Sequence, residues 1–64
     1  MIVNGEKVFI DKEISILSLL NQLKYDTKKV VVEVDKQIIK KDDYVDFLLK
    51  NSNIVEVISF VGGG

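Results

Sequence analysis

The feature that most constrains the fold is that a single segment of this chain has helical periodicity. Its apolar residues have the i, i+3, i+4, i+7 spacing of one helix face: Ile16, Leu19, Leu20 and Leu23. Ser15, just before them, is a suitable N-cap. We predict one amphipathic helix of about ten residues, roughly 15 Å long. Because so short a helix is marginal alone in water, it must be held by packing against other elements.

The residues before this helix predict a β-hairpin. Asn4-Gly5 lies between two apolar runs, and this pair favours a type I′ turn, which needs positive φ at both central residues. The turn pairs Val3 with Glu6, and the alternation of a strand then divides the side chains between two faces. We assign Met1, Val3, Val8 and Ile10 to the core face, and Ile2, Lys7 and Phe9 to the other.

The residues after the helix predict further strands, rich in β-branched residues, at 30–34, 37–40, 47–49 and 54–61. Turns are expected at 35–36 and 50–53, and a turn or single helical turn at 41–44. One helix with four or five strands indicates an α+β fold of two layers, in which the helix packs across one face of a sheet. We expect one domain over residues 1–61, followed by a flexible glycine tail at 62–64.

The composition excludes several kinds of chemistry. The 64 residues include no Cys, His, Trp, Pro or Arg, so the chain has no disulfide framework, no thiolate nucleophile and no imidazole base. Nine Lys against ten Asp and Glu give no basic surface of the kind that nucleic-acid binders show. No apolar run approaches the length of a membrane span. We therefore expect a cytoplasmic chain, monomeric when free, that binds neither nucleic acid nor membrane.

The remaining polar clusters have ordinary interpretations. Asp42 and Asp46 are four residues apart, with Asp43 between them, but a solvated acidic turn explains them better than an acid–base pair. Without His, no base is present to activate a serine, so we expect no enzyme activity, no metal site and no catalytic residue. The pairs Lys28-Lys29 and Lys40-Lys41 are either solvated surface or the rim of a contact with an acidic partner.

The last predicted strand points to a docking surface. If Val55 and Val57 face the helix, Ile58 and Phe60 stand on the open face of the sheet. Ile2 and Phe9 join them there if the first hairpin neighbours this strand. Four large apolar residues on one solvent face predict a partner-binding patch: Ile58, Phe60, Ile2 and Phe9.

The chain then ends on Gly62, Gly63 and Gly64. Glycines lack side chains to pack and lose the most entropy on ordering, which favours a bare arm over a continued strand. The last four residues reach roughly 13 Å when extended. Such an arm can enter a narrow channel of a partner and present only the Gly64 carboxylate. A frayed end, or residues left over from expression, is the alternative explanation.

The sequence resembles the ThiS family of sulfur carriers in thiamine biosynthesis. The resemblance lies in Val3-Asn4-Gly5, in the Ser15–Leu20 cap and helix start, in Val31–Val34 with Ile38-Ile39, and in Ile54–Gly64 with its Phe-Val-Gly-Gly-Gly ending. It implies a ubiquitin-like β-grasp fold, with a mixed sheet of four to five strands and one main helix.

The resemblance also implies a mechanism. A partner like the ubiquitin-activating enzymes, an adenylyltransferase, would adenylate the Gly64 carboxylate with ATP and magnesium. A persulfide donor would convert it to a thiocarboxylate, and thiazole synthase would accept the sulfur. ATP and magnesium would belong to the partner, so this chain would bind no cofactor. The alternatives are a carrier like the small subunit of molybdopterin synthase, a ubiquitin-like protein modifier, or a non-catalytic interaction module with a dispensable tail.

Overall fold

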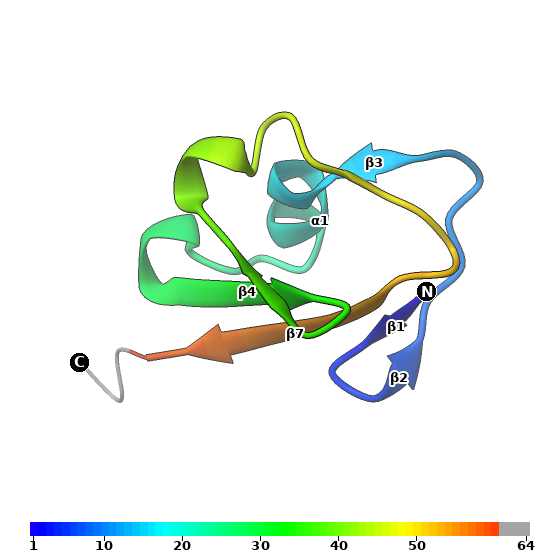
Figure 1. The fold of residues 1–64 in the computed structure, drawn as a ribbon, viewed down its shortest axis with the longest axis horizontal. Coiled ribbons are helices and arrows are strands. Elements are labelled where there is room, and N and C mark those ends of the chain that lie inside the picture. The colour runs from blue at the N-terminus through cyan, green and yellow to red at the C-terminus, as the bar shows by residue number, and fades with distance from the viewer. Residues whose placement is uncertain (61–64) are drawn as a thin grey trace.

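A computed structural model describes residues 1–60 and shows two layers, with a helix across one face of a sheet (Figure 1). The elements in this range are β1 (Ile2–Val3), β2 (Glu6–Lys7), β3 (Ile14–Ser15), α1 (Ile16–Gln22), η1 (Thr27–Lys29), β4 (Val30–Val34), β5 (Gln37–Ile39), η2 (Lys41–Asp43), β6 (Leu48–Leu49) and β7 (Ile54–Ser59), where η marks a 3₁₀ helix. Over residues 1–60, the main sheet has five strands in the order β2-β1-β7-β4-β5, and β3 pairs with β6 apart from it. Because β1 and β7 are parallel and the other pairs antiparallel, the predicted mixed sheet is confirmed.

Both predicted two-residue turns are present. Asn4 and Gly5 have φ of 51° and 84°, and Asp35 and Lys36 have φ of 50° and 71°, so all four residues have the positive φ that a type I′ turn requires. The pairing of Val3 with Glu6 is as predicted. However, β2 ends at Lys7 instead of continuing to residue 10.

The hairpin cannot extend to Ile10, because no residue of β1 stands opposite Phe9 or Ile10. Its last contact runs from the Val8 N–H to the Met1 carbonyl at 2.8 Å. The Asn51 side chain accepts a hydrogen bond from the Ile10 N–H at 3.0 Å and donates one to the Ile10 carbonyl at 2.8 Å. This contact satisfies the Ile10 backbone outside the sheet, and Ile10 is still buried.

Helix α1 begins as predicted and ends early. The Ser15 hydroxyl accepts from the Ser18 N–H at 3.0 Å, and Ile16, Leu19 and Leu20 are buried. The helix has seven residues, and Leu23, expected in the core, is 41% exposed.

The end of α1 has the hydrogen bonds of a Schellman motif. The N–H of Tyr25 donates to the Leu20 carbonyl at 2.9 Å, and that of Lys24 donates to the Asn21 carbonyl at 3.1 Å. Lys24 takes φ of 64°. Leu23 is the C-cap of α1, and the chain turns away at Lys24, directly after it.

The segment between η2 and β6 closes the core over α1. Carbonyls of Tyr44 and Phe47 accept from the first two N–H groups of the helix, those of Leu17 and Ile16, at 3.0 Å each. Together with the Ser15 cap, they satisfy the N–H groups that a helix start leaves unpaired. Tyr44 is itself buried, and its hydroxyl accepts from the Val32 N–H at 3.2 Å. In the part of the chain that the structure describes, no helix is long and apolar enough to cross a membrane.

Candidate functional site

The C-terminal end of β7 is the candidate site, because the sequence runs from there into the predicted glycine arm. β7 lies between β1 and β4. Val55 and Val57 are buried, whereas Ile58 is 46% exposed and Phe60, just after the strand, is 53% exposed. The predicted alternation of inward and outward side chains is therefore confirmed along β7. Residues 61–64, with Gly62, Gly63 and Gly64, lie outside the described residues.

Two loops meet Phe60 at this end of the sheet. The Phe60 N–H donates to the Lys29 carbonyl at 3.2 Å. The Lys41 Nζ lies 5.4 Å from the centroid of the Phe60 ring and donates to the Lys28 carbonyl at 3.0 Å. An ammonium group at this distance from an aromatic face is attracted by it, by about 0.5–1 kcal/mol at exposed sites. Lys41 thus ties η1, η2 and the end of β7 together.

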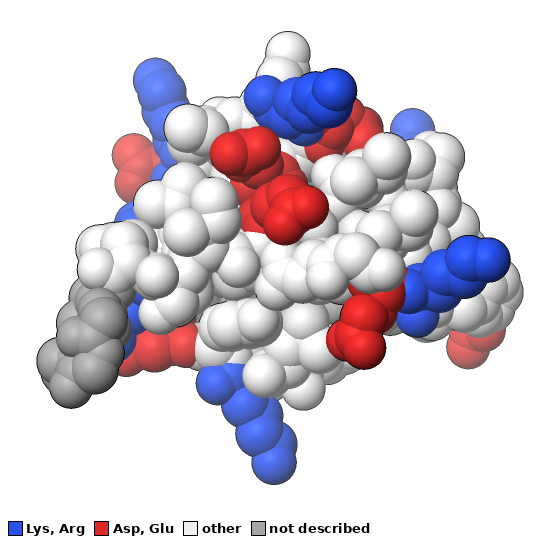
Figure 2. All heavy atoms as spheres, turned by 90° about the horizontal axis from the view of Figure 1, so that it is seen from below, with Lys and Arg blue, Asp and Glu red and all other residues white. Residues whose placement is uncertain are grey.

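The two predicted lysine pairs therefore flank the end of β7, one through Lys28 and Lys29 and the other through Lys41. All four lysines are exposed. No pattern in the sequence indicates this meeting, since residues 28 and 41 come together only through the fold. Seen from below the sheet, charged atoms of both signs are scattered among uncharged ones (Figure 2).

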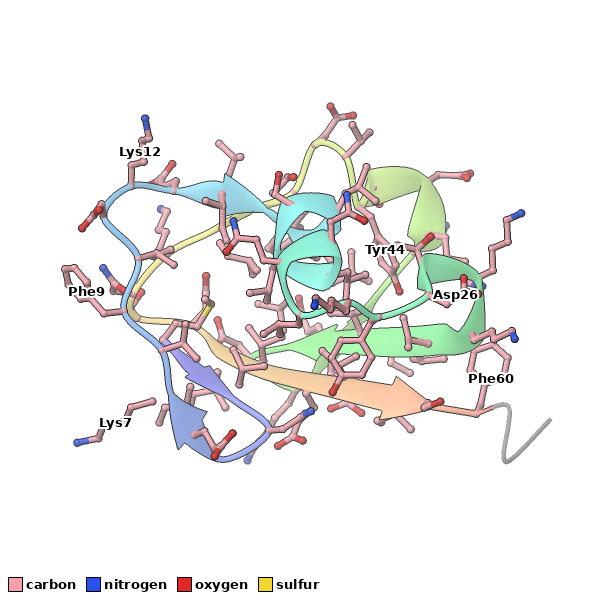
Figure 3. The ribbon with its side chains drawn as sticks, turned by 180° about the vertical axis from the view of Figure 1, so that it is seen from behind. Lys7, Phe9, Lys12, Asp26, Tyr44 and Phe60 are labelled. Atoms are coloured by element: carbon pink, nitrogen blue, oxygen red, sulfur yellow. The ribbon has the colours of Figure 1, made fainter. Side chains whose placement is uncertain are left out.

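The structure divides the predicted four-residue patch between two ends of the molecule. Ile58 and Phe60 are two residues apart at the end of β7. Ile2 pairs with Ile54, at the start of β7, about 13 Å along the strand from Ile58. Phe9 is 80% exposed and lies at the opposite end of the molecule from Phe60 (Figure 3).

Ile2 and Phe9 instead border a separate hollow. This open hollow of about 400 Å³ is lined by Met1, Ile2, Lys7, Val8, Phe9 and Asn51. The exposure of Ile58, Phe60 and Phe9 agrees with the sequence analysis, but a single patch of all four residues does not form on the sheet. Whether each of them contacts a partner stays a prediction.

The acidic residues of the sequence form no site. Asp42 and Asp43 lie in η2 and are exposed, as is Asp46. Within residues 1–60, no group of three or more carboxylate side chains is placed to hold a metal ion. The end of β7, which leads into the three C-terminal glycines, therefore remains the candidate site.

Comparison with known proteins places the chain in a family. The model of the ThiS family matches residues 1–64. The sulfur carrier protein ThiS of Bacillus subtilis (strain 168) is 36% identical over 63 residues, which are 97% of this chain and 96% of that protein. A thiazole synthase of Paramagnetospirillum magneticum is 30% identical over 64 residues, and this chain spans 20% of its length.

A solved structure agrees with these sequence matches. The crystal structure of the thiamine biosynthesis protein ThiS from Geobacter metallireducens superposes with a TM-score of 0.83 at 27% identity, covering 98% of this chain and 96% of that one. The ubiquitin-like β-grasp fold expected from the resemblance is thereby confirmed. Since the family model covers the whole chain and the Bacillus relative is covered almost end to end, the chain belongs to the ThiS family.

Proposed function

We propose that this chain is a sulfur carrier of thiamine biosynthesis and that its Gly64 carboxylate carries the sulfur. The observation that supports this most strongly is the match to the Bacillus sulfur carrier over 96% of its length, together with a family match that includes residue 64. In this role the chain is the substrate of its partners and performs no catalysis of its own.

The chemistry is set by the requirements of a carboxylate that must accept sulfur. A carboxylate is a poor electrophile, so an adenylyltransferase joins it to AMP from ATP, with magnesium, and releases pyrophosphate. The terminal sulfur of a donor persulfide then attacks the Gly64 carbonyl carbon, and AMP leaves. A second thiol attacks the remaining donor sulfur, forming a disulfide there and releasing the thiocarboxylate. Because the chain has no Cys or His, none of its own side chains competes for the sulfur.

The acceptor of the sulfur in this proposal is thiazole synthase. The Paramagnetospirillum protein of that name contains a stretch of its own chain similar to all 64 residues here. A stretch similar to this chain within a thiazole synthase supports an encounter between this chain and a separate thiazole synthase. Gly62 and Gly63 would thread into each partner, and the partner's body would rest on the exposed end of β7 at Ile58 and Phe60.

The test is intact-mass spectrometry of the chain after incubation with the adenylyltransferase, ATP, magnesium and a persulfide donor. We expect a mass increase equal to the difference between sulfur and oxygen, because one oxygen of Gly64 is replaced. A chain that lacks Gly64 is the matched control, and it should show no increase while unfolding at the same urea concentration. If the full chain gains no mass with a competent partner, the proposal is wrong.

A further inference from the structure

Within residues 1–60, the last part of β7 has one edge without a neighbouring strand. β7 has six residues and its parallel neighbour β1 has two. In Figure 1 the β1–β2 hairpin accordingly lies beside only the first part of β7. The later part of the strand, within residues 1–60, has β4 on one side and no strand on the other.

The hydrogen bonds show which backbone groups face this open side. The N–H of Phe60 donates to Lys29, and the carbonyl of Ile54 accepts from Asp35, at 3.2 and 2.8 Å. The even-numbered residues of β7 therefore bond toward β4. Because N–H and C=O groups alternate in direction along a strand, Ser59 and the other odd-numbered residues face the side of β1.

Asn4 marks the point where pairing on this side stops. Its N–H donates to the Val55 carbonyl at 2.9 Å, and its side-chain Oδ1 accepts from the Val57 N–H at 2.8 Å. The chain then turns away at Gly5. The register with β1 ends at Val55, so within residues 1–60 no strand lies beside Ser59 on this side, and Ser59 is exposed.

We propose that the Ser59 edge of β7 pairs with an extended backbone segment of the adenylyltransferase, which adds a strand to the sheet there. This inference rests on the proposed function, since it names how the activating partner holds the chain. Addition of a strand to an exposed edge is a recurrent way of binding extended backbone. The partner finds no side chains to recognise along the arm of glycines itself, so main-chain hydrogen bonds next to the arm add to its contacts with Ile58 and Phe60.

The position of the edge fits this partner better than a second copy of the chain. Ser59 is five residues before Gly64, which is about 17 Å when extended. The surface of an enzyme that holds the Gly64 carboxylate therefore lies within about 17 Å of Ser59. Pairing of two copies through so short an edge would bury far less than the roughly 1,200 Å² of a stable interface.

The test replaces the Ser59 amide by an ester through chemical synthesis of the full chain, which removes the outward N–H and keeps the side chain. The matched control is the same change at Ile38. The N–H of Ile38 faces outward from the far edge of β5, because Gln37 and Ile39 bond toward β4. Each ester also weakens the carbonyl of the preceding residue, which bonds to β4. That residue is Ile58 in the Ser59 ester and Gln37 in the Ile38 ester. The two variants therefore differ only in which edge of the sheet loses an N–H.

We expect the Ser59 ester to raise the KM of the chain for thiocarboxylate formation about tenfold with kcat unchanged, which is the loss of one hydrogen bond in the complex. The Ile38 ester should stay within about twofold of the unmodified chain. Equal KM values for the two esters would overturn the inference. Failure of the unmodified chain to gain sulfur would instead count against the proposed function.

Hydrogen exchange gives an independent measurement. The Ser59 amide should exchange quickly in the free chain and slow at least about tenfold when the adenylyltransferase and ATP are added, whether or not sulfur transfer occurs. Protection that rises with the concentration of the chain alone would show that a second copy occupies the edge, and would contradict the inference. Fast exchange in a saturated complex would contradict it as well.

Discussion

Asn4 combines a left-handed backbone position with two side-chain contacts. Its φ is 51°, its Oδ1 accepts from the Val57 N–H, and its Nδ2 donates to the Tyr25 hydroxyl at 3.2 Å. Asn4→Ala removes both contacts. It also leaves, in the left-handed region, a residue that has a Cβ atom but no polar side chain. We expect a loss of about 2 kcal/mol in the free energy of unfolding, measured by urea denaturation.

The control at this position is Asn4→Gly, which removes the same side-chain hydrogen bonds but accepts the positive φ. It should cost about 1 kcal/mol, because only the loss of hydrogen bonds remains. If the Ala and Gly variants are equally stable, backbone strain at residue 4 contributes nothing. If neither variant is destabilised, the hydrogen bond to Val57 makes no net contribution to the free energy of unfolding.

Helix α1 depends on groups outside itself, because seven residues are too few for a stable isolated helix. Ser15→Ala removes the side-chain acceptor of the Ser18 N–H. It should lower the free energy of unfolding by about 1 kcal/mol, or Tm by about 4–8 °C, in a thermal melt followed by circular dichroism.

Ser18→Ala is the matched control, since Ser18 is an exposed helical position whose side chain caps nothing. Ala has the higher helix propensity, so this variant should melt at the same temperature as the unmodified chain or slightly above it. A common Tm for the two variants would show that the Ser15 cap does not stabilise α1.

The elements that the sequence predicts correctly are those set by neighbouring residues. The Asn4-Gly5 turn, the Ser15 cap and the alternation along β7 each depend on a few consecutive side chains, so local chemistry decides them. The place of Ile10 depends instead on a contact across the fold. Its N–H bonds to the side chain of Asn51, 41 residues away, and no local pattern indicates that partner.

The features of the candidate site also divide into those set by neighbouring residues and those set by the fold. The exposure of Ile58 and Phe60 is a consequence of strand alternation, which the sequence contains. The separation of Phe9 from Phe60 requires the register between β1 and β7 and the early end of β2. The side-chain bond of Asn4 to Val57 spans 53 residues, so the unpaired edge at Ser59 could be found only in the folded chain.

At the scale of the whole molecule, the exposed aromatic residues are at opposite ends. Phe60 lies beside the residues that lead to Gly64, and Phe9 lies across the molecule from it (Figure 3). A standard interface covers about 800 Å² on each partner, less than a fifth of the 4596 Å² surface of this chain. We expect a partner of that size, centred on the residues that lead to Gly64, to cover Phe60 and not Phe9.

This geometry predicts different outcomes for two similar truncations. Phe60→Ala should raise the KM for thiocarboxylate formation about tenfold, as loss of a buried aromatic anchor in an interface does, whereas Phe9→Ala should leave it within about twofold. Both side chains are mostly exposed, at 53% and 80%, so each change should alter the free energy of unfolding by less than about 1 kcal/mol. If Phe9→Ala weakens the reaction as much as Phe60→Ala, the partner covers the sheet from end to end, and the four-residue patch predicted from the sequence acts as one surface.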